Sequence, residues 1–222
     1  MAGWLGGSSS STRFFVPKMA ADFAGDALTC LRGERLVFEN LSFRASPGEA
    51  LLLTGPNGSG KSSLLRLMAG LLPPAAGRLL WGDTAVADDP DAHRARLHYV
   101  GHLDALKPAL TVAENLAFYA SLRGKPADDE TLDRAMAAFR LDRLADTPAR
   151  FLSQGQRRRT ALARVLAAPA PLWLLDEPTL ALDDASLAAL AAVLISHLAD
   201  GGHLIAATHA PIAVKARRLE LA

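Results

Sequence analysis

The sequence predicts an α/β protein built around a parallel β-sheet, and three observations carry that prediction. Short apolar runs have the length of buried strands, at residues 50–54, 97–100, 172–175 and 203–207. Segments with apolar residues at helical spacing fall between them, at residues 61–72, 111–123, 129–139, after 153 and at 187–198. No strand pattern lies between about 103 and 168. Strands that alternate with helices are typical of a parallel sheet, and the long helical stretch predicts an inserted helical subdomain at about 103–168.

An antiparallel β subdomain is expected near the start of the patterned sequence. Residues 27–43 contain short runs rich in Leu, Val and Phe between turn residues, and another short strand is expected at 79–81. One domain is predicted over residues 23–222. Residues 1–22 contain a Gly/Ser patch that cannot contribute to a core, which predicts a disordered tail. This tail is either a functional extension or the result of an upstream start, with Met19 as the true first residue.

Composition excludes several classes of protein. Half of the 222 residues are hydrophobic and 21% are charged, so the chain can bury a core. The 24 basic and 23 acidic side chains leave no basic excess, and we expect no nucleic-acid partner. A single cysteine, Cys30, excludes a disulfide scaffold and a multi-cysteine zinc site, and favours a reducing compartment. No run of about 20 apolar residues predicts a membrane span, so a cytosolic or peripheral protein is expected.

A glycine-rich segment between a predicted strand and a predicted helix fits the phosphate-binding pattern G-x-x-x-x-G-K-[ST]. It consists of Gly55, Pro56, Asn57, Gly58, Ser59, Gly60, Lys61 and Ser62, with Ser63 next to it. Glycines let backbone N–H groups turn toward phosphates, and the following helix N-terminus adds partial positive charge. Lys61 is expected to reach the terminal phosphates of ATP, and the Ser62 hydroxyl to bind Mg²⁺. The alternative is a Gly-rich turn before a helix.

Two acidic residues, Asp176 and Glu177, follow the apolar run at 172–175. At the tip of a strand, Asp176 can complete the Mg²⁺ shell, whereas Glu177 points elsewhere and can polarise a water against the γ-phosphate. Taken alone, the pattern also fits a strand that ends in a solvated acidic turn. Beside a phosphate loop, the catalytic interpretation is favoured.

A third segment resembles the LSGGQ signature of ABC-transporter ATPases; it consists of Leu152, Ser153, Gln154, Gly155 and Gln156. Ser153 and Gln156 also form a capping-box pattern, which places a helix N-terminus where an anion can bind. Taken alone, the segment fits an ordinary capped helix. In the ABC family this end contacts the γ-phosphate held by the opposite subunit, so the resemblance implies a homodimer with two ATP molecules between its subunits. Gln154 stands where the family has a glycine.

Four further positions take their roles from the same resemblance. It implies that Asp183 lies in a loop that crosses the dimer interface, and that His209 is a switch histidine that contacts the γ-phosphate. His102 stands where the family has a glutamine, and its imidazole either bridges a Mg²⁺-bound water and phosphate or packs against the helical subdomain. Arg32 stands where an aromatic residue stacks on adenine, and it is either a stacking guanidinium or a surface arginine.

Several less specific segments resemble one subfamily, the ATP-binding subunits of haem exporters in cytochrome c maturation. They lie at residues 28–38, 101–107, 110–116 and 208–211. The resemblance implies a P-loop NTPase core of the ABC type, with ATP and Mg²⁺ as cofactors. It also implies ATP hydrolysis that drives haem export or haem-chaperone release, with integral membrane subunits and haem-handling proteins as partners. The expected location is peripheral, on the cytoplasmic face of the bacterial inner membrane.

Two other functions stay open at this point. The chain fits the ATPase subunit of another small-molecule exporter, and less well a soluble ABC protein that acts on ribosomes or DNA. Three arginines at residues 157–159 bear on the second alternative, because they fit either a nucleic-acid site or a solvated face of the helix. We favour the solvated face.

Overall fold

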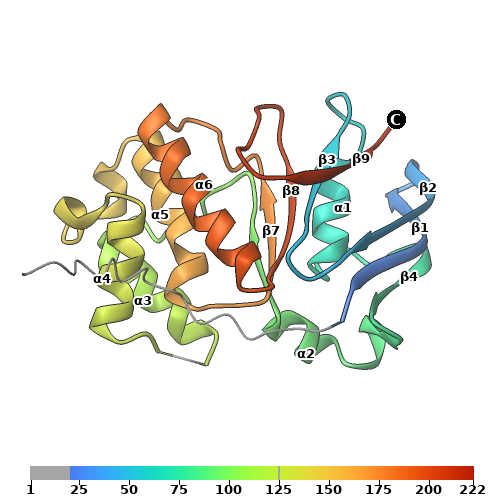
Figure 1. The fold of residues 1–222 in the computed structure, drawn as a ribbon, viewed down its shortest axis with the longest axis horizontal. Coiled ribbons are helices and arrows are strands. Elements are labelled where there is room, and N and C mark those ends of the chain that lie inside the picture. The colour runs from blue at the N-terminus through green and yellow to red at the C-terminus, as the bar shows by residue number, and fades with distance from the viewer. Residues whose placement is uncertain (1–20, 125) are drawn as a thin grey trace, which may run out of the picture.

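Helix α1 (Lys61–Met68) packs against two β-sheets in the computed structural model, which describes residues 21–124 and 126–222 (Figure 1). The first sheet is antiparallel, with the order β2–β1–β4–β5. Its strands are β1 (Phe23–Arg32), β2 (Arg35–Ala45), β4 (Ala76–Trp81) and β5 (Thr84–Ala85). The second sheet is parallel, with the order β6–β7–β8–β3–β9. Its strands are β3 (Ala50–Thr54), β6 (Leu97–Val100), β7 (Leu172–Asp176), β8 (His203–Ala207) and β9 (Ala216–Glu220).

Buried side chains alternate between the two faces of the parallel sheet, because successive residues of a strand point to opposite sides. In β7, Leu172 and Leu174 pack in the same core cluster as α1 and the antiparallel sheet. Trp173 and Leu175 pack in a second cluster, which also contains residues of the long helices. Both faces of β7 are therefore buried, which is why its sequence is a continuous apolar run rather than an alternating one.

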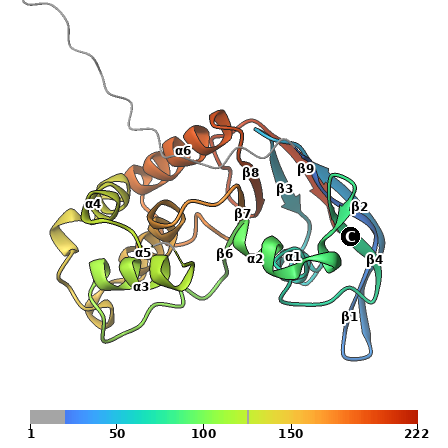
Figure 2. The ribbon, with the colours of Figure 1, turned by 90° about the horizontal axis from the view of Figure 1, so that it is seen from below.

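Helix α2 (Pro90–Ala95) lies beside α1, where His93 Nε2 is 2.8 Å from Met68 O (Figure 2). The other helices cover the other face of the parallel sheet and one end of the molecule. They are α3 (Val112–Leu122), α4 (Asp129–Ala138), α5 (Gln154–Ala167) and α6 (Asp184–Ala199). Helices α3, α4 and α5 lie together, on the side away from the antiparallel sheet (Figure 2). The predicted α/β fold with an antiparallel sheet and a group of inserted helices is confirmed. No helix in residues 21–124 or 126–222 is long and apolar enough to cross a membrane.

Helix α1 ends at Met68, whereas the apolar spacing predicted a helix to residue 72. Gly70 adopts a left-handed backbone conformation, with φ of 70°. The N–H of Gly70 donates to Leu67 O at 3.0 Å and that of Leu71 donates to Arg66 O at 2.9 Å. This pair of bonds is a Schellman motif, which closes a helix before the prolines that follow.

Strand β9 was not predicted, because the apolar run at 203–207 was expected to be the last strand. It pairs in parallel with β3 at the edge of the sheet. Its sequence, Ala-Arg-Arg-Leu-Glu, is mostly polar and its side chains are largely exposed, so it lacks the buried run that identifies the central strands.

The predicted tail at 1–22 falls outside the described residues, except for its last two. Ala21 O lies 3.2 Å from His203 Nε2. The Asp22 carboxylate accepts a hydrogen bond from Arg44 Nη1 at 2.9 Å. These contacts attach the start of the described chain to strands β8 and β2.

Candidate functional site

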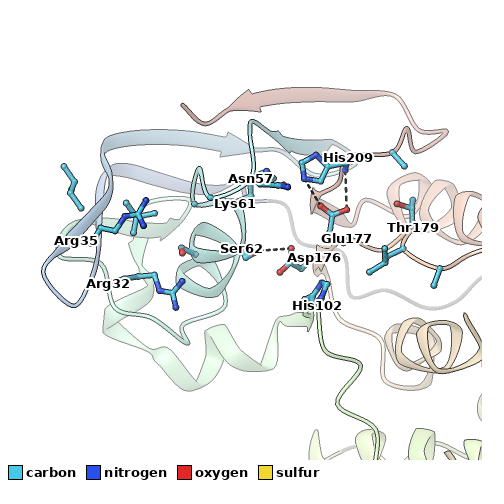
Figure 3. A pocket seen from close by; sticks show the side chains of 18 residues that line it. Arg32, Arg35, Asn57, Lys61, Ser62, His102, Asp176, Glu177, Thr179 and His209 are labelled. Carbon is cyan, nitrogen blue, oxygen red and sulfur yellow. Dashed lines mark hydrogen bonds and ion pairs between the residues drawn. The ribbon is translucent and has the colours of Figure 1, made fainter. Parts of the chain in front are cut away.

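A cleft of about 990 Å³ opens at the carboxyl ends of the parallel strands (Figure 3). In open α/β sheets, ligands bind at this edge. The loops after β3, β6, β7 and β8 each contribute side chains to the cleft, and the β1–β2 hairpin lines it on one side. Of the predicted site residues, those that line it are Arg32, Asn57, Gly58, Gly60, Lys61, Ser62, Ser63, His102, Asp176, Glu177 and His209.

The phosphate loop joins β3 to α1, as its pattern predicts. Gly60 has a φ of 100°, and a Cβ atom there would lie 2.6 Å from Val37 Cγ1, so this position requires glycine. Helix α1 begins at the next residue, Lys61. Lys61 Nζ donates to Gly55 O at 2.7 Å and to Pro56 O at 2.9 Å, which holds the ammonium group across the loop.

Asp176 and Ser62 meet at the bottom of the cleft. Asp176 is the last residue of β7 and is 2% exposed. Ser62 Oγ donates to Asp176 Oδ1 at 3.1 Å. The second carboxylate oxygen, Oδ2, is buried and has no hydrogen-bond partner among the described residues. A buried carboxylate oxygen without a partner is unfavourable, so this atom is available to a cation.

Glu177 turns away from the strand and faces His209. Its φ of 49° is in the left-handed region, and its N–H donates to Ala207 O at 2.8 Å. The backbone N–H of His209 donates to Glu177 Oε2 at 3.3 Å, and His209 Nε2 lies 3.6 Å from Oε1 (Figure 3). The two carboxylates of the cleft thus have different partners: a serine hydroxyl for Asp176 and a histidine for Glu177.

Two arginines of the β1–β2 hairpin line the far side of the cleft. Arg32 was expected there, whereas Arg35 was missed. The two residues are paired across the tight turn of the hairpin, so a two-residue turn at Gly33–Glu34 was the signal that could have placed Arg35 beside Arg32. His102, which follows β6, reaches the same cleft and is exposed. Thr179, after Glu177, was also missed; its Oγ1 lies 3.2 Å from Thr208 Oγ1.

The signature segment does not line the cleft of its own chain. Its capping box is confirmed: Ser153 Oγ accepts from Gln156 N at 3.2 Å, and Gln156 Oε1 accepts from Ser153 N at 2.8 Å. Gly155 packs tightly, because a Cβ atom there would lie 2.6 Å from Ala181 O. Leu152 is buried, whereas Ser153 and Gln154 are exposed at the N-terminus of α5.

Asp183 lies at the N-cap of α6 rather than in the cleft. Its Oδ1 accepts from Ser186 N at 2.8 Å. Hydrogen bonds from Ser186 hold the pKa of the Asp183 carboxyl below its usual value, because they stabilise the charged form.

The solvated face expected at residues 157–159 is wrong for its middle residue. Arg158 is 3% exposed, and its guanidinium donates to groups of two loops at the edge of the cleft. The side chain of Arg157 donates to Leu152 O, and that of Arg159 donates to Phe139 O and Arg140 O. Three consecutive arginines indicate solvent exposure by composition alone, but Arg158 is buried and all three side chains donate to backbone carbonyl groups.

Known proteins match the chain over most of its length. A family model described as ABC transporter matches residues 38–180. The cytochrome c biogenesis ATP-binding export protein CcmA of Rhodospirillum rubrum is 60% identical over 196 residues, which cover 88% of this chain and 83% of that protein. The protein of the same name from Rhodopseudomonas palustris (strain BisB5) is 51% identical over 199 residues, 89% of this chain and 96% of that protein.

Solved structures agree with the fold. An ATP-binding subunit of an ABC transporter has a TM-score of 0.76 at 26% identity, over 84% of this chain and 79% of that chain. A bacterial Atm1-family ABC exporter with ATP bound has a TM-score of 0.82 at 24% identity, over 96% of this chain and 39% of that chain. With the family match and the identity to the CcmA proteins, these likenesses lead to one conclusion. The chain belongs to the ABC transporter family, among the ATP-binding export proteins of cytochrome c biogenesis.

Proposed function

We propose that this chain is the ATP-hydrolysing subunit of an export complex that serves c-type cytochrome biogenesis, and that hydrolysis drives haem export or release of a haem chaperone. One observation carries the proposal. A phosphate loop, two differently partnered carboxylates and a histidine gather in one cleft of a chain that is 60% identical to an ATP-binding export protein named for cytochrome c biogenesis.

The phosphate loop supports binding of the ATP phosphates. The N-terminus of α1 and the backbone N–H groups of the loop attract negative charge. Lys61 Nζ uses two donors on Gly55 O and Pro56 O. An ammonium group has three donors, so one remains for a phosphate oxygen. Arg32 lines the cleft from the β1–β2 hairpin, and we expect its guanidinium to stack on the adenine ring.

The residues around Ser62 fit a Mg²⁺ ion. A hard cation prefers oxygen ligands, and the unpartnered Asp176 Oδ2 and the neighbouring Ser62 Oγ offer two kinds. We expect Ser62 and Asp176 to hold the ion, which when bound offsets negative charge on the phosphates. His102 lines the same cleft, and we expect its imidazole to accept a hydrogen bond from a water bound to the ion.

Glu177 supplies the general base in this proposal. Its carboxylate takes the proton of a water as the water oxygen bonds to the γ-phosphorus and the bond to the ADP oxygen breaks. His209 Nε2 lies 3.6 Å from the Glu177 carboxylate, and we expect His209 to donate to the γ-phosphate and to hold the base in orientation. We do not assign the base role to Asp176, because its buried carboxylate accepts from Ser62 Oγ and is expected to bind the cation.

A second copy of the chain completes the site. The N-terminus of α5 has exposed polar groups at Ser153 and Gln154, yet none of the signature residues lines the cleft of the same chain. A helix N-terminus attracts anions, so we infer that it contacts the γ-phosphate bound to the other copy. Asp183, exposed after Leu182, would lie in the interface of this homodimer.

The membrane and haem-handling partners are proposed from the names of the relatives. Those relatives are export proteins, and the described part of this chain has no membrane-spanning helix. We therefore propose integral membrane subunits as partners, haem-handling proteins reached through them, and a peripheral position on the cytoplasmic face of the bacterial inner membrane. Because basic and acidic side chains are nearly equal in number, we propose no nucleic-acid partner.

The substitution Glu177→Gln tests the proposal. It keeps the shape and removes the base, so the variant should bind MgATP, lower turnover at least about 10²-fold, and accumulate as an ATP-bound dimer. ATP turnover and size-exclusion chromatography with MgATP measure both effects. The matched control is Glu130→Gln, an exposed carboxylate on α4 that should leave turnover unchanged. Near-normal turnover of Glu177→Gln in the complex would remove Glu177 from the catalytic role.

A further inference from the structure

The buried guanidinium of Arg158 joins two loops that border the cleft. Its Nη2 donates to the backbone carbonyls of Asp176 and Glu177, at 2.8 Å for Glu177. Its Nη1 donates to Gly101 O at 2.9 Å and to Asp104 Oδ1 at 3.3 Å. A planar guanidinium presents donors in a fixed fork, so one side chain can hold groups on both loops at once.

The first of these loops needs such support. Glu177 is held in the left-handed region, with φ of 49°. This conformation is unfavourable for a residue with a Cβ atom, and such residues persist where the surrounding structure holds them. Arg158 bonds the carbonyl group of Glu177 itself and that of the preceding residue. These bonds fix the peptide orientation that sends the Glu177 side chain into the cleft toward His209.

The second loop carries His102. Gly101 O, which accepts from Arg158, belongs to the residue directly before His102. The Asp104 carboxylate forms an ion pair with the same guanidinium, and both side chains are largely buried. Arg158 lies on α5, one turn after the signature segment at the helix N-terminus. A shift of this helix end would therefore reach the Glu177 turn and the His102 loop through one side chain.

We propose that Arg158 is a positioning residue for ATP hydrolysis: it holds the Glu177 turn in its productive orientation and ties that orientation to the signature helix α5. The inference rests on the proposed base role of Glu177. Arg158 itself does not line the cleft, so it acts through Glu177 and the His102 loop and not by contact with ATP.

The test compares Arg158→Gln, Arg158→Lys and wild type in the full chain assembled with its membrane subunits. Misplacement of a catalytic group by about 1 Å can cost up to about 10²-fold. Arg158→Gln should therefore lower kcat by about 10- to 100-fold, whereas KM for ATP should change by less than about threefold because the phosphate loop is intact. Arg158→Lys, which keeps charge and three donors, should fold and recover part of the lost kcat.

A double variant separates positioning from general structural damage. If Arg158 acts through Glu177, Arg158→Gln combined with Glu177→Gln should turn over about as slowly as Glu177→Gln alone and bind MgATP equally well. The matched control is Arg164→Gln, which removes a buried arginine from the same helix that does not line the cleft. Arg164→Gln should lower the free energy of unfolding about as much as Arg158→Gln does, but it should keep the wild-type kcat.

Three results would overturn the inference: wild-type kcat in Arg158→Gln, a fully additive loss in the double variant, or an equal loss of kcat in Arg164→Gln. Normal turnover of Glu177→Gln is a different failure, because it removes the proposed function whatever Arg158 does. If Glu177→Gln lowers kcat and Arg158→Gln leaves it at the wild-type value, only the positioning role of Arg158 is removed.

Discussion

At the scale of single residues, the site depends on giving two adjacent carboxylates different surroundings. Asp176 ends a buried strand and faces the Ser62 hydroxyl, whereas Glu177 lies in a left-handed turn and faces His209. The end of the strand accounts for the separation, because Asp176 keeps the extended backbone of β7 whereas the left-handed backbone of Glu177 turns its side chain in another direction. One dipeptide can therefore supply a cation ligand and a base.

The role of Ser62 leads to a prediction at this scale. Ser62→Ala removes the hydroxyl that bonds Asp176 Oδ1, so the Mg²⁺ concentration for half-maximal turnover should rise by about tenfold or more. Titration of ATPase activity with Mg²⁺ at saturating ATP measures it. Ser62→Thr keeps a hydroxyl and should retain the wild-type midpoint. An unchanged midpoint in Ser62→Ala would place the cation elsewhere.

At the scale of elements, the sequence predicts best the features that depend on local patterns. The phosphate loop, the strand that ends in Asp176, and the capping box at Ser153 are recognised by spacing alone, and the structure has them. Strand β9 was missed because an exposed edge strand carries no apolar run. The contacts of Arg158 were missed because three of its four acceptors are backbone groups 57, 18 and 19 residues away, which side-chain patterns do not report.

The capping box of α3 gives a prediction about stability. Thr111 Oγ1 accepts from Glu114 N at 3.1 Å, and Glu114 Oε2 accepts from Thr111 N at 2.8 Å. Thr111→Ala removes the acceptor of the Glu114 N–H and should lower the free energy of unfolding by about 1 kcal/mol. Thr111→Ser keeps the hydroxyl and should lose much less. Urea denaturation of both variants measures the difference, and equal stability of the two would show that the cap contributes nothing.

At the scale of the whole molecule, four buried histidines tie stability to pH. Burial lowers the pKa of His98 to about 3 and that of His197 to about 4, and it also lowers the pKa values of His93 and His203. Each is neutral in the folded chain, whereas the unfolded chain takes up protons below about pH 6.5. The unfolded state then binds more protons, so stability falls as the pH drops from about 6.5 toward 4.

The size of this effect can be measured by urea denaturation between pH 7.5 and 5, where carboxylates stay ionised. The free energy of unfolding should be nearly flat above pH 7 and fall below 6.5, with a slope that approaches about 1.4 kcal/mol per pH unit for each neutral histidine. His98→Gln keeps an N–H donor for Ala168 O and should reduce the slope by about one histidine's share. A stability that stays constant from pH 7 to 5 would contradict this reading of the buried histidines.

We propose that each ATP site is completed only in a dimer. In it, one copy supplies Lys61 and Glu177, and the other supplies Ser153. The most direct test of a shared site mixes two inactive variants. The first is Glu177→Gln. The second is Ser153→Glu, whose carboxylate repels phosphate but is compatible with the dipole at a helix N-terminus. In a mixed dimer, one site carries both changes and the other carries neither. An equal mixture should therefore recover about a quarter of wild-type ATP turnover, since about half the dimers are mixed and each has one intact site. Turnover no higher than that of the two variants assayed separately would contradict a site shared between two copies.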